Sequence, residues 1–213
     1  MAADREIDRY RSLATAQRQQ QESDLVRQYA PLVKRIAHHL SHRLPATVEF
    51  DDLLQAGTLG LLEAARKSGL MIATAESCTG GLISGALTEI AGSSDVFDRG
   101  FVTYSNAAKI AMLGVQQQTV DSFGAVSEQT AQEMALGALS GSLADVAVSV
   151  TGVAGPGGTA QKPEGLVCFG IARKGAPVLT EAIQFGAIGR ANVRAATVHH
   201  ALELLLDACS QTV

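Results

Sequence analysis

The chain has 213 residues, of which 46% are hydrophobic and 18% charged, as in a globular protein rather than a disordered one. Residues 1–67 carry ten basic and nine acidic side chains and residues 68–213 carry seven and twelve, so neither part has the basic excess of a DNA-binding protein. The three cysteines are distant from one another and form no CxxC pair, which suggests neither a disulfide framework nor a metal site. No apolar run approaches the roughly 20 residues that span a bilayer. We therefore expect a cytoplasmic protein without membrane contact.

The amino-terminal part of the chain has the pattern of helices. Apolar residues recur at three- and four-residue spacings between Leu25 and Leu40, and Leu53 opens a second helical stretch. Glycine is rare there, because 19 of the 21 glycines follow residue 67. This change of composition predicts a short all-helical segment, residues 1–60, followed by an α/β domain, residues 61–213.

After this boundary, strands alternate with helices. We predict strands at 70–75, 100–104, 145–150, 165–172 and 178–185, and helices at 79–90, 106–113, 127–139 and 190–208. Such alternation predicts an α/β fold with three layers, α/β/α, in which helices cover a sheet. The last two strands are joined by the short segment 174–177 and should form a hairpin, which makes the sheet mixed rather than wholly parallel.

The segment 75–81 follows the first predicted strand of this domain and opens a helix. A strand-to-helix turn can hold a hydroxyl group at the end of a sheet, where free N–H groups of the helix start can stabilise a negative oxygen. Ser77 is therefore the candidate nucleophile. The same residues fit equally well a helix cap followed by close packing of helix and strand.

A serine nucleophile needs a base, and no histidine of this chain is a convincing one. The five histidines lie in predicted helices, where surface or packing roles are favoured. Lys109 is the alternative base, if burial lowers its pKa, and Tyr104 could relay a proton or orient the lysine. Position alone also fits a tyrosine at the rim of the core and a solvated lysine.

A glycine-rich loop, residues 152–158, follows the strand that ends near Thr151. Open α/β sheets bind ligands at the carboxyl ends of their strands, but this loop matches neither the dinucleotide fingerprint nor the Walker A pattern. Thr151 can donate a hydrogen bond to a ligand there, or the loop is simply a connection. Arg190 and Arg194 begin the last helix, where each could bind a phosphate or carboxylate or else face solvent.

Five segments, in this order, resemble the CinA C-terminal domain family: residues 75–81, 91–94, 99–106 with Lys109, 124–128 and 151–156. Members of the family that are similar to this chain hydrolyse the carboxamide of nicotinamide mononucleotide, giving nicotinate mononucleotide and ammonia in pyridine nucleotide salvage. The resemblance thus implies an amidohydrolase with a small-molecule nucleotide substrate. It implies no metal and no organic cofactor for this step.

Carried over residue by residue, the resemblance makes Ser77 the nucleophile and makes Tyr104 and Lys109 the pair that handles protons. It implies that Cys78, next to the nucleophile, is packed rather than reactive. The positions that it places near the substrate are Glu76, Thr79, Gly80, Gly81, Asn106, Thr151, Gly152 and Arg190. We also expect a homo-oligomer. Hydrolysis of another small amide is an alternative that needs the same machinery and a different pocket.

Residues 24–65 resemble something unrelated, a fragment of the flagellar-type sigma factors of bacterial RNA polymerase, through the segments 29–40, 43–46, 51–57 and 60–62. The sigma segments that melt and recognise promoter DNA are missing, so transcription initiation is not expected. The join falls inside a predicted helix, because 61–69 would also serve as the first helix of a CinA-type domain; the chain thus resembles a fusion, natural or engineered. A catalytically silent module that captures core RNA polymerase is the less favoured alternative.

Overall fold

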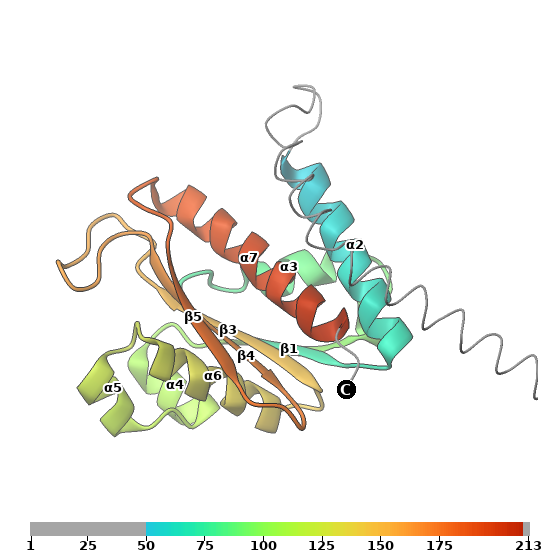
Figure 1. The fold of residues 1–213 in the computed structure, drawn as a ribbon, viewed down its shortest axis with the longest axis horizontal. Coiled ribbons are helices and arrows are strands. Elements are labelled where there is room, and N and C mark those ends of the chain that lie inside the picture. The colour runs from blue at the N-terminus through green and yellow to red at the C-terminus, as the bar shows by residue number, and fades with distance from the viewer. Residues whose placement is uncertain (1–49, 211–213) are drawn as a thin grey trace, which may run out of the picture. The chain divides into compact units, whose positions relative to one another are not determined.

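A computed structural model describes residues 50–210 of the chain, with side chains from residue 55 onward, and its elements form an α/β domain (Figure 1). The first predicted helical stretch lies outside the described residues, and the predicted domain boundary at residue 60 stays a prediction. The elements are α2 Phe50–Ser68, β1 Ile72–Glu76, α3 Leu82–Thr88, a 3-10 helix Ser93–Asp95, β2 Phe97–Val102, α4 Asn106–Leu113, α5 Gln117–Phe123, α6 Glu128–Ser140, β3 Val146–Gly152, β4 Leu166–Arg173, β5 Leu179–Gln184 and α7 Arg190–Ser210.

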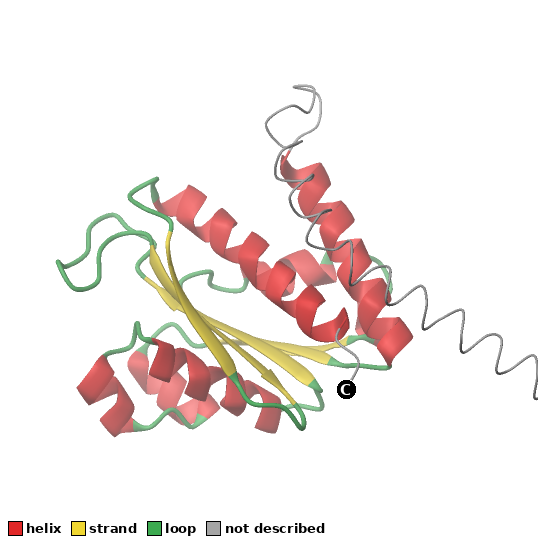
Figure 2. Ribbon diagram, in the orientation of Figure 1, coloured by secondary structure: helices red, strands yellow, loops and turns green. Residues whose placement is uncertain are grey.

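The five strands form one mixed sheet in the order β2-β1-β3-β4-β5. Strand β1 pairs in parallel with β2 on one side and with β3 on the other, whereas β4 is antiparallel to both β3 and β5. Helices α2, α3 and α7 lie on one side of the sheet and α4, α5 and α6 on the other (Figure 2). The predicted three-layer architecture, the mixed sheet and the late hairpin are therefore confirmed.

Each face of the sheet has its own apolar core. The larger core joins β3 and β4 to α2, α3 and α7 and contains the fully buried Phe169 and Leu205. The smaller core lies under α4, α5 and α6 and contains the fully buried Met134. Gly137 of α6 lets that helix approach α4, because a Cβ atom there would lie only 1.9 Å from the carbonyl oxygen of Leu113.

Helix α2 runs without a break through the predicted join of the two resemblances. Leu61, Leu62 and Ala65 have no exposed surface and belong to the larger core, and α2 packs against α7. Burying a leucine side chain contributes about 1.5–3 kcal/mol relative to an exposed one. The end of the sigma-like stretch is thus an integral helix of the α/β domain.

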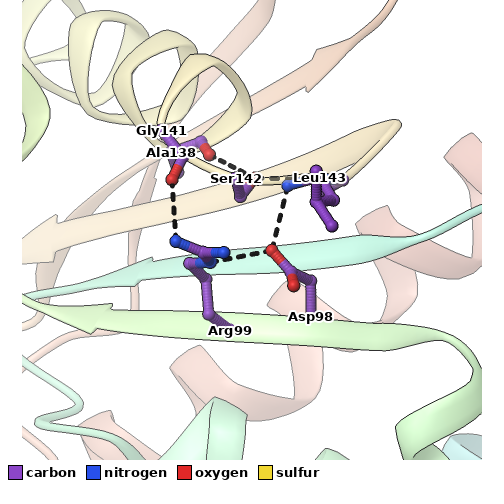
Figure 3. A network of polar contacts seen from close by, with 7 residues as sticks. Asp98, Arg99, Ala138, Gly141, Ser142 and Leu143 are labelled. Carbon is purple, nitrogen blue, oxygen red and sulfur yellow. Dashed lines mark hydrogen bonds and ion pairs between the residues drawn. The ribbon is translucent and has the colours of Figure 1, made fainter.

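A polar network ties the edge strand β2 to the turn between α6 and β3 (Figure 3). The Asp98 carboxylate accepts hydrogen bonds from the amide of Leu143 at 2.9 Å and from Nε of Arg99 at 2.8 Å, and Arg99 also donates to the carbonyl of Gly141 at 3.2 Å. These bonds, the one from the Leu143 amide first, lower the pKa of Asp98. The network fixes β2 near its amino end.

Three differences from the predicted elements concern local detail. Helix α3 begins at Leu82 rather than at Thr79, because Gly81 at its N-cap adopts a left-handed conformation with φ of 99°. Strand β2 begins at Phe97 and ends at Val102, earlier than predicted. Helix α5, a short polar helix, was not predicted at all.

None of the described helices is long and apolar enough to cross a lipid bilayer. The cytoplasmic location stays a prediction.

Candidate active site

The candidate site lies where the three parallel strands end. In the sheet, β2 neighbours β1 at one edge of that strand and β3 neighbours it at the other. The connecting helix α3 covers one face of the sheet, and α4, α5 and α6 cover the opposite face. Ligands of open α/β sheets bind at such a reversal of strand order, outside the carboxyl ends of the strands. Ser77 follows β1, Thr103 follows β2, and Thr151 and Gly152 close β3, so this topology gathers residues that are distant in the sequence.

Lys109 contacts Ser77 directly. Its Nζ atom donates a hydrogen bond to Oγ of Ser77 at 2.8 Å and another to the carbonyl oxygen of Thr103 at 2.9 Å. Lys109 lies in the first turn of α4, whose start is fixed by Ser105, a side-chain cap that accepts from the amide of Ala108 at 3.1 Å. The predicted pairing of nucleophile and amine is therefore present in the structure.

The surroundings of Lys109 favour its neutral form. Lys109 is only 1% exposed, and burial lowers its pKa, against a smaller opposing electrostatic effect of Cys78. A lysine that is neutral more readily than in water can accept a proton from a hydroxyl group. The alternative of a solvated Lys109 is therefore wrong.

Cys78, the neighbour of Ser77, is also buried but chemically quiet. Burial raises the pKa of the Cys78 thiol to about 11, so at neutral pH the sulfur keeps its proton. Only the thiolate is a strong nucleophile. The structure thus agrees with a packed Cys78 and leaves Ser77 as the candidate nucleophile.

Glu76 organises the turn that carries Ser77. Its carboxylate has no exposed surface; Oε1 accepts from the amide and the hydroxyl of Ser84 at 2.8 and 2.7 Å. Oε2 accepts from the Thr79 hydroxyl at 2.7 Å and from the amides of Gly81 and Ile83 at 2.9 and 3.1 Å. A buried carboxylate that accepts this many bonds is held in place and holds its donors in return.

This arrangement corrects two expectations. Glu76 does not line the pocket beside Ser77, and neither do Thr79, Gly80 and Gly81. The amide groups at the start of α3, which we expected to stabilise a negative oxygen, instead donate to the Glu76 carboxylate. Glu76 therefore has a structural role in place of the predicted substrate contact, and Thr79 and Gly81 are among its donors, because the carboxylate needs them once it is buried. A substrate contact of Gly80 stays a prediction.

A pocket of about 270 Å³ opens beside the Lys109–Ser77 pair. Five predicted site residues besides this pair line it, as do four residues to which the sequence assigned no role in the site. The lining is Ser77, Cys78, Tyr104, Asn106, Lys109, Ala125, Val126, Thr151, Gly152, Ala154 and Arg190. No histidine is among them, as expected. The new members Ala125 and Val126 lie in a segment that carries the family resemblance but contains no reactive side chain.

Tyr104 and Arg190 meet at the mouth of the pocket. Nη2 of Arg190 lies 3.3 Å from the Tyr104 hydroxyl, and Nη1 donates to the carbonyl oxygen of Gly155 at 2.9 Å. Tyr104 is 64% exposed, and its hydroxyl group contacts Arg190 rather than the Lys109–Ser77 pair. The structure therefore places Tyr104 in the pocket without showing a proton relay between it and Lys109.

Thr151 is buried and donates its hydroxyl to the carbonyl oxygen of Ala125 at 2.7 Å, so it joins two sides of the pocket. Arg194 lies outside the lining and donates to the carbonyl oxygen of Thr79 at 2.7 Å, which supports the turn after Ser77. Of the two arginines of α7, only Arg190 thus lines the pocket.

The described part of the chain contains no cluster of three or more histidine, cysteine, aspartate or glutamate side chains that could hold a metal ion. Within the pocket the reactive groups are a hydroxyl and an amine in hydrogen-bond contact. Such a pair can perform nucleophilic acyl transfer, in which the amine takes the proton of the hydroxyl group as its oxygen attacks a carbonyl carbon.

Comparison with protein families confirms both resemblances. The model of the CinA C-terminal domain matches residues 57–209, and the model of Sigma-70 region 2 matches residues 25–69. The two matches overlap in α2, the helix in which the sequence predicted the join.

Curated relatives include enzymes and proteins named after the family. The nicotinamide-nucleotide amidohydrolase PncC of Enterobacter agglomerans is 60% identical over 123 residues, which are 57% of this chain and 75% of that protein. A CinA-like protein of Chloroherpeton thalassium is 60% identical over 111 residues, 52% of this chain, but the match spans only 26% of that longer protein.

Solved structures of similar proteins have the same fold. The competence/damage inducible protein CihA of Agrobacterium tumefaciens is 52% identical and superposes with a TM-score of 0.73 over 78% of this chain and 100% of that chain. A CinA superfamily protein of Escherichia coli is 34% identical, with a TM-score of 0.70 over 79% of this chain and 98% of that chain.

Proposed function

The chain belongs to the CinA C-terminal domain family, and from that premise we propose that its α/β domain is an amidohydrolase that converts nicotinamide mononucleotide to nicotinate mononucleotide and ammonia. The observation that carries the proposal is the hydrogen bond from buried Lys109 to Ser77 inside a pocket. The similarity to an enzyme named nicotinamide-nucleotide amidohydrolase supports the choice of substrate.

The reaction begins with the Lys109–Ser77 pair. Neutral Lys109 takes the hydroxyl proton of Ser77 as its oxygen attacks the carboxamide carbon of the substrate, which gives a tetrahedral intermediate. The resulting ammonium group of Lys109 returns the proton to the departing nitrogen, so ammonia leaves and an acyl-enzyme ester remains. Attack by water, with Lys109 again accepting the proton, then releases the carboxylate product and restores Ser77.

The rest of the pocket suits a charged nucleotide. Arg190 offers a guanidinium group at the mouth, where it can bind a phosphate with two parallel hydrogen bonds. Tyr104 lies beside Arg190, and Asn106 adds a polar side chain to the lining. We assign Arg190 to the phosphate group and the interior of the pocket, near Ser77, to the carboxamide.

The proposal is tested by incubating the protein with nicotinamide mononucleotide and measuring ammonia and nicotinate mononucleotide in parallel. We expect the two products in equal amounts. Lys174→Met is the matched control. Lys174 pairs with Asp145, which precedes β3 and so lies at the opposite end of that strand from Thr151. This variant should keep the wild-type rate. Absence of ammonia above the enzyme-free blank contradicts the proposal.

A substrate panel separates the alternatives. Nicotinamide, nicotinamide riboside, glutamine and asparagine share the carboxamide but lack the nucleotide phosphate, so we expect much slower ammonia release from each. Faster release from one of them would favour the alternative of an amidase for another small amide. Inactivity on the whole panel would favour a catalytically silent binding module.

Capture of core RNA polymerase has less support. Leu61 and Leu62 belong to the segment that matches the sigma model, yet both are fully buried in the α/β domain and cannot contact another protein without unfolding it. A pull-down with core polymerase should therefore retain none of the chain. The expected homo-oligomer stays a prediction.

A further inference from the structure

Lys162 lies in the loop between β3 and β4 and reaches across to the turn between α5 and α6. Its Nζ atom donates to the carbonyl oxygen of Phe123 at 2.6 Å and also to that of Val126. An ammonium group that donates to two carbonyl groups of one turn makes charge-assisted bonds, which are stronger than neutral ones. One side chain thus fixes both ends of the segment 123–126.

The two carbonyl groups between these ends are also held by side chains. The carbonyl oxygen of Gly124 accepts from the hydroxyls of Ser127 and Thr130 at 2.9 and 2.8 Å. That of Ala125 accepts from Thr151 at 2.7 Å. Every carbonyl of the segment 123–126 therefore has a side-chain donor, although the segment after residue 123 has no helix or strand to define its shape.

Lys162 is itself held in position. Its amide donates to the Thr159 hydroxyl at 3.0 Å, and its carbonyl accepts from the Thr159 amide at 2.9 Å. The ammonium group passes so close to Gly124, whose φ is +82°, that a Cβ atom there would lie 2.6 Å from Nζ. The contact thus depends on a fixed loop on one side and on a glycine on the other.

The turn that Lys162 holds is part of the pocket. Ala125 and Val126 line it, whereas Lys162 does not, and its ammonium group donates to Phe123 and Val126 rather than to Ser77. We propose that Lys162 is a positioning residue that fixes the segment 124–126 as the substrate-facing wall of the pocket. Because it acts on this wall and not on the reacting pair, it sets the affinity for the substrate rather than the rate of the chemical step. This inference rests on the proposed function.

The test is the steady-state kinetics of ammonia release from nicotinamide mononucleotide by wild type and Lys162→Met. We expect KM to rise by about tenfold or more, since two charge-assisted bonds that shape the wall are lost, with kcat within about threefold of wild type. Lys162→Arg restores a cation that can donate to two carbonyl groups and should recover part of the affinity. Lys174→Met should leave KM and kcat unchanged.

An unchanged KM in Lys162→Met, or a fall in kcat at constant KM, overturns the inference. If Lys162→Met does not fold, Lys162→Gln retains a donor for one carbonyl group and should give an intermediate KM; a wild-type KM there also overturns it. If wild type releases no ammonia, the proposed function fails. Amide hydrogen exchange then tests the positioning role of Lys162 independently of activity. Amides of residues 120–130 should then exchange faster in Lys162→Met than in Lys174→Met, and equal rates contradict the positioning role.

Discussion

Replacing Lys109 by methionine separates its chemical role from its structural one. Methionine keeps an unbranched side chain of similar size in a site that is only 1% exposed, but it cannot accept a proton. Loss of a general base lowers the rate on the order of 10²–10⁴-fold, which corresponds to about 3–5 kcal/mol of transition-state stabilisation. We expect the kcat for ammonia release to fall by this amount.

The 2.8 Å hydrogen bond between Lys109 and Ser77 adds a sharper expectation. Residues that act as one unit do not lose activity independently, so the double variant Ser77→Ala/Lys109→Met should be no less active than Ser77→Ala alone. The assay is ammonia release by wild type, both single variants and the double variant. Thermal melts accompany it, because a shift of more than about 2–4 °C would mean that stability changed by over 1 kcal/mol.

Two results would refute this reasoning. A loss of less than about tenfold in Lys109→Met would mean that another group takes the proton of Ser77. A double variant whose loss equals the product of the two single losses would mean that the two side chains act independently. Either result would require a different base, and Tyr104, which also lines the pocket and which the family resemblance assigns to proton handling, would be the first candidate.

Three further predictions follow from the fold and the site. Burial lowers the pKa of Lys109, and only its neutral form accepts a proton, so kcat should rise with pH through a midpoint below the ordinary lysine pKa of about 10.4; a kcat that falls over this range contradicts the assignment. Glu76→Gln places an amide N–H group among buried donors and should lower the free energy of unfolding by about 2–3 kcal/mol in urea melts, whereas a loss under about 0.5 kcal/mol would exclude the role of the carboxylate in holding the turn. Leu61→Ala should cost about 2–5 kcal/mol, because Leu61 belongs to the core of the α/β domain; a surface-like loss near zero would mean that α2 is only an appendage.

Local signals made much of the fold predictable from the sequence. Helix α4 begins and ends as predicted because Ser105 caps its first turn and Gly114 ends it in a left-handed conformation. The late hairpin follows from two β-rich runs with a short connection, and the helical pattern across residue 61 showed that the join lies within one helix. These features depend on neighbours in the chain, which a sequence displays directly.

Contacts between distant residues account for what the sequence did not predict. Helix α3 starts late, and Glu76 is structural, because one buried carboxylate collects donors from residues 79–84. Lys162 had no assigned role, since its partners lie 36 and 39 positions earlier in the chain. The candidate nucleophile and base were named from their positions, and the family resemblance favoured them over the packing alternatives. Position alone left a solvated Lys109 as an alternative, which its burial in the structure excludes.

The most direct measurement of the central claim is the rate of ammonia release from nicotinamide mononucleotide by Ser77→Ala beside wild type at equal protein concentration. The account predicts a loss on the order of 10³-fold or more, with an unchanged melting temperature, because the variant lacks the oxygen that forms the acyl-enzyme. A folded Ser77→Ala protein that retains more than about a tenth of the wild-type rate would contradict it, since water or another side chain would then attack the amide.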